Sequence, residues 1–367
     1  MRIAVVTTSY PASPDDACGH FVRAEALELA RLGHEVHVVA PEPDRALMVR
    51  SDDALRIWSL PHGAAFGWPG AASRVRHNPW RAAGAAGFAA LAMARLNALR
   101  PDRIVAHWLV PCAWPIALGS RCPAELHAIA HGADVRMLLG MPAPVRERLV
   151  SALLHREVKL RFVAHTLRDA LVNGLSPSLG ACVIARSSVR PASVSVPDVT
   201  ARARELRRQC EAPILATVAG RLVQDKRVEL AIGAAGLLDG RMHLAVAGDG
   251  PDAERLRLLA DAGHVRFLGR VPRHDALAWI AASDVLIHPS AVEAAPTVVR
   301  EARALGTSVV ACASGDVERW AGDDRGIVIA EPTVASIARA VFLFAPTPGK
   351  ASRGEDASCH RDSSPLP

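Results

Sequence analysis

The chain has 367 residues, of which 50% are hydrophobic and 22% charged, a composition that excludes a disordered chain, a collagen and a disulfide-rich scaffold. Single hydrophobic cores rarely grow beyond about 250 residues, so the length indicates two domains. The net charge is +6, and only three of the 43 basic residues are lysines (Lys159, Lys226 and Lys350), a bias that we attribute mainly to genome composition.

The first half begins with a predicted strand–helix–strand unit. An apolar run at 3–6 is followed by a polar loop at 7–19, by apolar residues at helical spacing over 22–30, and by an alternating strand at 34–39. Such a unit implies a parallel sheet. We predict further strands of this domain at 103–106, 126–130 and 162–165.

The second half repeats the pattern with short, continuous apolar runs, which are typical of buried parallel strands. These predicted strands are 214–218, 244–247, 265–268, 285–288, 308–311 and 327–329. We therefore expect an α/β protein with two Rossmann-like, doubly wound parallel-sheet domains facing a cleft, with ligands at the carboxyl ends of the strands. The expected boundaries are 1–190 for the first domain, 191–212 for a linker, 213–345 for the second domain and 346–367 for a disordered tail.

Cysteines and apolar stretches indicate the compartment. The seven cysteines are odd in number and form no C-x-x-C pair, so we expect reduced thiols in a cytoplasmic protein and no metal site. The first apolar run is too short for a signal peptide. The longest apolar stretch, between Arg81 and Arg95, is too short to span a bilayer. We therefore expect any membrane contact to be peripheral.

The segment 284–311, DVLIHPSAVEAAPTVVREARALGTSVVA, is the most informative. A strand ends at His288, Pro296 stands where a helix begins and Gly306 where it ends. The free amides around 294–298 then form an anion site, with Glu293 at its mouth.

The helix that follows is predicted to bury an arc of Val298, Ala302 and Leu305. Arg300 and Arg303 should face outward, with Glu301 at the edge of the arc, where its carboxylate needs a partner. The alternative is two ordinary surface glutamates, because this spacing is common.

A cationic loop follows the first strand of the second domain. Arg221 and Lys226 lie in the segment GRLVQDK, at a strand end suited to a pyrophosphate. The alternative is a solvated charged loop. The turn at 248–251 contains glycines that allow close approach of the backbone to a ligand. The chain has no G-x-G-x-x-G or Walker motif, which argues against a dehydrogenase.

Two histidines follow neighbouring strands of the first domain. His107 and His131 should both lie at the cleft, where they are either structural or catalytic.

Together these segments resemble glycosyltransferase family 4, the retaining nucleotide-sugar transferases of the GT-B fold. The resemblance covers about residues 1–342 and is carried by the order of GRLVQDK (220–226), AVAGDGP (245–251), VRFLGRVP (265–272) and the segment 283–311, with HGADV (131–135) upstream.

The resemblance implies roles for individual residues. Arg221 and Lys226 match the cations on the donor phosphates, and Glu301 matches the glutamate that binds the nucleotide ribose. Glu293 matches the glutamate on the donor sugar, next to amides near Ala295 and Pro296. In the first domain, Gly19 matches the glycine loop that approaches the diphosphate, and His131 matches the histidine close to the transferred sugar.

The implied function is retaining transfer of a hexose-type sugar from a nucleotide diphosphate sugar to a carbohydrate or lipid-linked acceptor, without a cofactor. The sequence has no D-x-D, so Arg221, Lys226 and a helix N-terminus would replace a divalent metal. The alternatives are a weakly active or regulatory nucleotide-sugar-binding protein, or another GT-B activity such as a phosphorylase or a sugar-nucleotide epimerase.

The segment 54–101 lacks Asp and Glu but contains six arginines and five large aromatic residues, Trp58, Phe66, Trp68, Trp80 and Phe88. This pattern suits an anionic membrane surface, and we expect docking on the inner membrane face. The alternative is an acceptor-side loop region with an Ala-rich helix. We do not expect nucleic acid as a partner.

Overall fold

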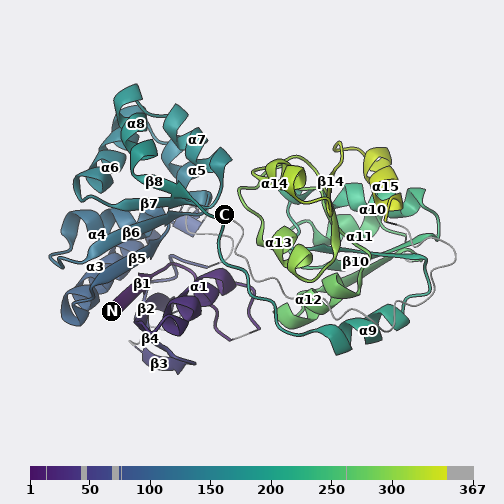
Figure 1. Ribbon diagram of the computed structural model, residues 1–367, viewed down its shortest axis with the longest axis horizontal. Coiled ribbons are helices and arrows are strands. Elements are labelled where there is room, and N and C mark those ends of the chain that lie inside the picture. Colours follow the sequence, from purple (N-terminus) through teal and green to yellow (C-terminus); the bar gives the residue numbers. More distant parts are fainter. Residues whose placement is uncertain (14, 43–47, 68–73, 76, 262, 345–367) are drawn as a thin grey trace.

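The protein has two α/β domains that lie side by side in a computed structural model (Figure 1). The structure describes residues 1–344 except 14, 43–47, 68–73, 76 and 262. The tail predicted at 346–367 and the side chain of Trp68 fall outside the described residues.

The first domain contains an eight-stranded sheet in the order β3-β4-β2-β1-β5-β6-β7-β8. All neighbouring strands pair in parallel except β3, which is antiparallel to β4. The strands are β1 (Arg2–Val6), β2 (Glu35–Glu42), β3 (Met48–Asp52), β4 (Leu55–Pro61), β5 (Arg103–His107), β6 (Glu125–Ala130), β7 (Lys159–Phe162) and β8 (Ser187–Val189).

Helices connect these strands and cover the sheet (Figure 1). They are α1 (His20–Arg31), α3 (Arg81–Leu99), the helical turn η1 (Leu109–Ala113), α4 (Trp114–Gly119), α5 (Ala133–Leu139), α6 (Ala143–His155), α7 (His165–Asn173) and α8 (Pro177–Ala185).

The second domain contains a six-stranded parallel sheet in the order β11-β10-β9-β12-β13-β14. The strands are β9 (Ile214–Ala219), β10 (Met242–Ala247), β11 (Val265–Gly269), β12 (Val285–His288), β13 (Ser308–Ala311) and β14 (Ile327–Ile329). The helices are α9 (Thr200–Arg208), the short turn η2 (Gln224–Lys226), α10 (Val228–Leu237), α11 (Ala253–Leu259), α12 (Arg273–Ala282), α13 (Thr297–Ala304), α14 (Val317–Asp323) and α15 (Val334–Phe342).

Alternating residues of the second sheet supply two different cores. Ile287 and Val246 pack into the core on one face, while Leu286 and Ala245 pack into the core on the other. Burial on both faces explains why these strands read as continuous apolar runs.

Both sheets reverse their strand order at one point, between β1 and β5 in the first domain and between β9 and β12 in the second. Ligands of such sheets bind at this switch point, beyond the carboxyl ends of the strands. The loops that follow these four strands are therefore where a site is expected, and they contain most of the predicted site residues.

The strand predicted at 162–165 is wrong by three residues. The structure has β7 at Lys159–Phe162, and helix α7 begins at His165. Two basic residues, Lys159 and Arg161, obscured the strand in the sequence. Arg161 is tolerated because it forms an ion pair of 2.5 Å with the buried carboxylate of Glu25 on α1.

The segment 54–101 places most of its described aromatic side chains in or against the core, although most residues of helix α3 itself are not buried. Strand β4 is buried at alternate positions, and Phe66 and Phe88 are only 4% and 3% exposed. Trp58 donates to the Nδ1 of His37 at 3.1 Å. Of the four described aromatic residues of this segment, only Trp80 is largely exposed, at 86%, so the prediction of surface aromatics is wrong for Phe66 and Phe88.

Helix α3 is longer than the apolar stretch expected between Arg81 and Arg95. With 19 residues it meets the length and composition of a bilayer span, which corrects the earlier expectation. It nevertheless packs Phe88, Ala92 and Leu96 against the first domain, as surface helices of globular proteins do.

The segment predicted as a linker, 191–212, contains helix α9, which packs against α12 of the second domain. Its apolar side chains Ala203 and Leu206 are buried there. The arginine and glutamate residues that suggested a linker lie mostly on the exposed face of this helix.

Candidate active site at the domain junction

Two loops of the second domain pack backbone against backbone. A Cβ on Gly248 would lie 1.8 Å from the carbonyl oxygen of Gly220, and one on Gly250 would lie 2.3 Å from that of Leu222. The amide of Leu222 also donates to the carbonyl of Asp249 at 2.9 Å. The glycines of the 248–251 turn therefore hold the cationic loop that carries Arg221 and Lys226.

Lys226, Glu293 and His288 meet at the carboxyl ends of β9 and β12. The Nζ of Lys226 forms an ion pair with Glu293, and the Nε2 of His288 lies 3.4 Å from the same carboxylate. Burial raises the pKa of Glu293, but the contact with His288 and the charge of Lys226 outweigh this and hold its pKa at about 2. Glu293 is therefore an anion throughout the neutral range.

The loop after Glu293 leads into the N-terminus of α13. Pro296 precedes the helix in an extended conformation, and no side chain caps the first turn. Ala295 is half-buried in the same loop. The amides at this end of α13 are not capped by a side chain, so the anion site predicted beside Lys226 stays a prediction with donors available for it.

The buried face of α13 differs from the predicted arc. Val299, Glu301 and Ala302 are buried, whereas Val298 and Leu305 are half-buried. The two arginines do not face solvent. Arg300 donates to the carbonyl of Ala192, and Arg303 pairs with Asp324 at 2.7 Å. The correction has a physical cause, because ion pairing allows charged residues to occupy positions that a hydrophobic arc would exclude.

Glu301 finds its partner on another helix. Its Oε1 forms an ion pair with Arg273, the first residue of α12. The Nδ1 of His20, at the start of α1 in the first domain, lies 3.8 Å from the same oxygen. The sequence predicted the need for a partner but not that two domains supply it.

His131 is held by an unusually well-anchored loop at the end of β6. The buried carboxylate of Asp134 accepts from the amides of His131, Gly132, Val135 and Leu109 at 2.7–3.1 Å. Burial raises the pKa of Asp134, although these four bonds oppose the rise.

The two predicted histidines contact each other. The Nε2 of His131 lies 2.9 Å from the Nδ1 of His107, and the rings are stacked. Burial, with a smaller effect from Arg161, lowers the pKa of His107 to about 3. Burial also holds the pKa of His131 well below its usual value. Both imidazoles are therefore neutral near pH 7, with His131 as the partly exposed member.

Gly19 begins α1 with a left-handed backbone, φ 69°. A Cβ here would lie 2.5 Å from the carbonyl of Ser9, so the fold itself requires a glycine. In the same loop, the carbonyl of Asp15 accepts from the amide of Arg273 at 2.8 Å. The loop that ends at Gly19 therefore lies against the start of α12, at the junction between the two domains.

The two domains touch at the predicted site. A Cβ on Gly132 would lie 3.5 Å from the Cβ of Ala294, which places the His131 loop against the Glu293 loop. Asp316 accepts from the amides of His165 and Thr166 at 2.6 and 3.0 Å, across the junction at the start of α7.

Sequence reasoning missed three members of this junction. His288 was seen only as the end of a strand, and Arg273 and Asp316 were not singled out. His288 ends β12 and Arg273 comes shortly after β11, both at the expected edge, so their positions were available as a signal. Asp316 was not predictable because its partners are about 150 residues away.

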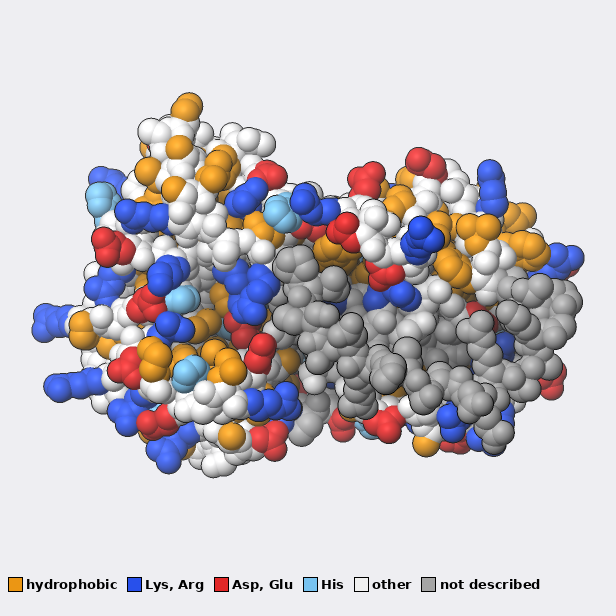
Figure 2. All heavy atoms as spheres, in the orientation of Figure 1, with side chains coloured by type: hydrophobic (Ala, Val, Ile, Leu, Met, Phe, Trp, Pro, Cys, Tyr) orange, Lys and Arg blue, Asp and Glu red, His pale blue; other side chains and the backbone are white. Residues whose placement is uncertain are grey.

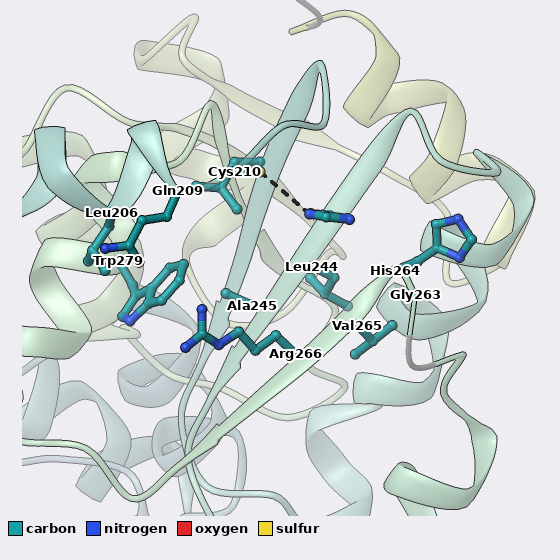
Figure 3. A pocket seen from close by; sticks show the side chains of 12 residues that line it. Leu206, Gln209, Cys210, Leu244, Ala245, Gly263, His264, Val265, Arg266 and Trp279 are labelled. Carbon is teal, nitrogen blue, oxygen red and sulfur yellow. Dashed lines mark hydrogen bonds between the residues drawn. The ribbon is translucent and has the colours of Figure 1, made fainter.

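A cavity of about 280 Å³ lies elsewhere, at the amino ends of β9, β10 and β11. Figure 3 shows Trp279, Arg266 and Cys210 among its lining residues, with the Sγ of Cys210 3.6 Å from His243. It lies at the edge of the sheet opposite the switch point and so does not belong to this site. Among the described residues, no group of three or more His, Cys, Asp or Glu is arranged to hold a metal ion.

Comparison with known proteins agrees with this geometry. The family model described as glycosyl transferases group 1 matches residues 203–352, which include the cationic loop and both glutamates. The chain is similar to this family over those residues. It is 26% identical to TuaC of Bacillus subtilis, a protein named for glycosyl transfer in teichuronic acid biosynthesis, over 94% of this chain and 89% of that one.

Further relatives show the same relationship. Glycogen synthase of Mycobacterium tuberculosis is 27% identical to this chain, over 98% of this chain and 90% of that protein. Sucrose-phosphate synthase of Thermosynechococcus elongatus has a TM-score of 0.70 at 18% identity, over 94% and 91% of the two chains. Starch synthase IV of Arabidopsis thaliana, bound to ADP and acarbose, gives 0.67 at 17% identity, over 95% and 92%. The predicted GT-B fold is thereby confirmed.

Proposed function

We propose that this glycosyltransferase moves a hexose-type sugar, with retention, from a nucleotide diphosphate sugar to a carbohydrate or lipid-linked acceptor. The observation that carries the proposal is the cluster of Lys226, Glu293 and the uncapped N-terminus of α13, which lies against the His131 loop of the other domain. A cation and free amides suit a diphosphate, and a buried carboxylate suits sugar hydroxyls.

In the proposed reaction the bond between the anomeric carbon and the diphosphate oxygen breaks as negative charge develops on the diphosphate. Lys226, Arg221 and the free amides of the first turn of α13, from Thr297 on, stabilise that charge. The acceptor oxygen attacks the same face of the sugar, and its proton passes to the leaving diphosphate oxygen. We assign no protein general base. Glu293 and neutral His131 would orient the sugar by hydrogen bonds.

The test is a two-step assay on the full chain. ADP, GDP, UDP and their glucose conjugates are first screened for protection against thermal unfolding, because a ligand that binds only the folded state raises the Tm. The protecting sugar nucleotide is then tested for turnover with candidate acceptors. Transfer with retained anomeric configuration supports the proposal.

Other outcomes identify the alternatives. Protection without turnover indicates a nucleotide-sugar-binding protein. A requirement for free phosphate indicates a phosphorylase, and interconversion without an acceptor indicates an epimerase. Protection by none of the six compounds contradicts the proposed donor class.

We also propose that the α3 side of the first domain contacts an anionic membrane at its cytoplasmic face. Trp80 is exposed just before α3, arginines stand at both ends of the helix, and its outward face is rich in alanine and includes Leu91. Acidic and basic side chains are mixed on the face of this domain seen in Figure 2, which therefore shows no large basic patch. Exposed apolar and aromatic side chains beside arginines favour contact with an anionic lipid interface.

Flotation with vesicles tests this contact. Wild-type protein should float with phosphatidylcholine vesicles that contain phosphatidylglycerol and should float less with phosphatidylcholine alone. Trp80→Glu and Leu91→Glu should abolish flotation. Leu237→Glu, at a residue of the second domain that is 60% exposed, is the matched control and should float normally. Equal recovery with both vesicles, or none with either, contradicts the proposal.

A further inference from the structure

Arg273 occupies the surroundings of Glu301, where the proposed function places the ribose of the donor. Arg273 is the first residue of α12, directly after the Val-Pro turn that follows β11. The side chains of Arg273 and Glu301 are only 14% and 8% exposed. The pair is therefore nearly buried at the carboxyl edge of the sheet, away from the exposed ion pairs of the surface.

The two carboxylate oxygens of Glu301 differ in their contacts. Both Arg273 and His20 approach Oε1, the former as an ion pair and the latter at 3.8 Å. Within the part of the chain that the structure describes, Oε2 receives no hydrogen bond. A carboxylate oxygen has two lone pairs, so Oε2 can accept from two hydroxyl groups.

Arg273 is itself fixed from several sides. Its Nη2 also donates to the carbonyl of Ser195 at 2.8 Å, and its amide donates to the carbonyl of Asp15 in the first domain at 2.8 Å. Its Nε is buried and, among the described residues, has no acceptor. A buried N–H without an acceptor is rare in folded proteins, so this guanidinium is held in place at the cost of one unmade hydrogen bond.

We propose that Arg273 is a positioning residue for the donor nucleotide. It holds Oε1 of Glu301, so that Oε2 stays directed to the 2′- and 3′-hydroxyls of the ribose. This inference rests on the proposed function. Without Arg273 the carboxylate would rotate freely and would remain nearly buried without its cation, so that a ribose and a deoxyribose would bind about equally.

The chemistry favours arginine over lysine at this position. Two acceptors, Glu301 and Ser195, share one terminal nitrogen, and the planar guanidinium keeps its remaining donors in fixed directions. Lysine would retain the charge but could not maintain this geometry.

The experiment measures discrimination between ribose and 2′-deoxyribose. ADP, GDP and UDP are titrated calorimetrically into the wild-type chain, and the tightest binder is compared with its 2′-deoxy form. We expect the wild type to prefer the ribonucleotide by about tenfold or more, the scale of hydrogen bonds to a charged group. Arg273→Ala should bind the ribonucleotide about tenfold more weakly and discriminate by less than about twofold.

Controls separate positioning from a merely structural role. Arg202→Ala removes a half-exposed arginine of α9 that pairs with Glu205 on the same helix, and it should keep the full preference. Glu301→Ala and the double variant with Arg273→Ala should bind alike, because both act through the same oxygen. If Arg273→Ala weakens both nucleotides equally and keeps the preference, the inference is overturned.

The remaining outcomes are also decisive. If Arg273→Ala does not fold, Arg273→Lys is used, and an unchanged ribose preference in that variant overturns the inference. Binding of none of the three nucleotides by the wild type contradicts the proposed function, and the inference with it. Wild-type binding without any ribose preference overturns the inference alone.

Discussion

The ammonium group of Lys226 faces two anions, the partly buried carboxylate of Glu293 and the proposed diphosphate. Lys226→Ala should lower kcat/KM for the donor by on the order of 2–4 kcal/mol, because it removes a cation and leaves a carboxylate without its partner. Initial rates at varied donor concentration measure the effect. Lys159→Ala is the matched control, since this lysine is 65% exposed and remote from the junction. Wild-type kinetics in Lys226→Ala would contradict the assignment of Lys226 to the donor site.

The histidine pair predicts how stability depends on pH. His107 titrates near 6.5 in the unfolded chain and at about 3 when folded, so the unfolded state binds the extra proton between these values. Stability should therefore fall as the pH drops below about 6.5, by up to about 1.4 kcal/mol per pH unit from this group. Urea unfolding between pH 7 and pH 4.5 measures the slope.

Two variants isolate that contribution. His107→Phe should reduce the slope by the share of His107, because phenylalanine does not titrate, whereas His131 continues to contribute. His155→Gln, at an exposed position at the end of α6, should leave the slope as in the wild type. Equal slopes in the wild type and His107→Phe would show that His107 titrates normally in the folded protein.

At the scale of elements, the 248–251 turn holds the cationic loop by backbone contact. Gly248→Ala places a Cβ 1.8 Å from the carbonyl of Gly220 at φ 147°, so one of the two loops must move. We expect a loss of about 1–3 kcal/mol in the free energy of unfolding, with weaker nucleotide binding. Denaturant unfolding and calorimetry measure the two effects.

Gly236→Ala is the control for the same domain. Gly236 lies in α10, where an added Cβ meets no atom within 4 Å. An alanine there should stabilise the protein by about 0.5–1 kcal/mol and leave nucleotide binding unchanged. If both glycine variants had the same stability and the same nucleotide affinity, the contact between the two loops would not determine either property.

The elements that were predictable from sequence are those that hydrophobic runs specify. Strands β9 to β14 were found nearly to the residue because both faces of the sheet are buried. Strand β7 was shifted because Arg161 breaks the run and is stabilised only by Glu25, which is 136 residues away. The hairpin of β3 and β4 was missed because its aromatic and basic residues also fit a surface segment. Local patterns could not resolve either case, because distant contacts decide them.

At the scale of the whole molecule, the same contrast applies to the site. Strand ends were predictable, so Lys226, Glu293 and His131 could be expected near one another from topology alone. The ion pairs that complete the site were not, because they depend on how the helices dock. Arg273 with Glu301 joins α12 to α13, and His20 adds a contact from the other domain.

Asp316 connects the two domains. Its carboxylate accepts from the amides of His165 and Thr166 and from the Thr166 hydroxyl, which satisfies the N-terminus of α7 in the first domain. Bonds to a charged acceptor contribute about 1.5–3 kcal/mol each, and even a net loss of about 2 kcal/mol would shift a two-state domain equilibrium about thirtyfold. Asp316→Ala should therefore favour separated domains.

Small-angle scattering and donor kinetics measure that shift together. Asp316→Ala should increase the radius of gyration of the free protein and lower kcat/KM, and a saturating donor should reverse part of the expansion because it binds both domains. Asp316→Asn keeps one acceptor oxygen, so its radius of gyration and its kcat/KM should lie between those of the wild type and those of Asp316→Ala. Asp169→Ala removes a 56% exposed carboxylate of the same helix α7 and should change neither quantity. Superimposable scattering of Asp316→Ala and the wild type, with equal kinetics, would mean that other contacts alone hold the domains together.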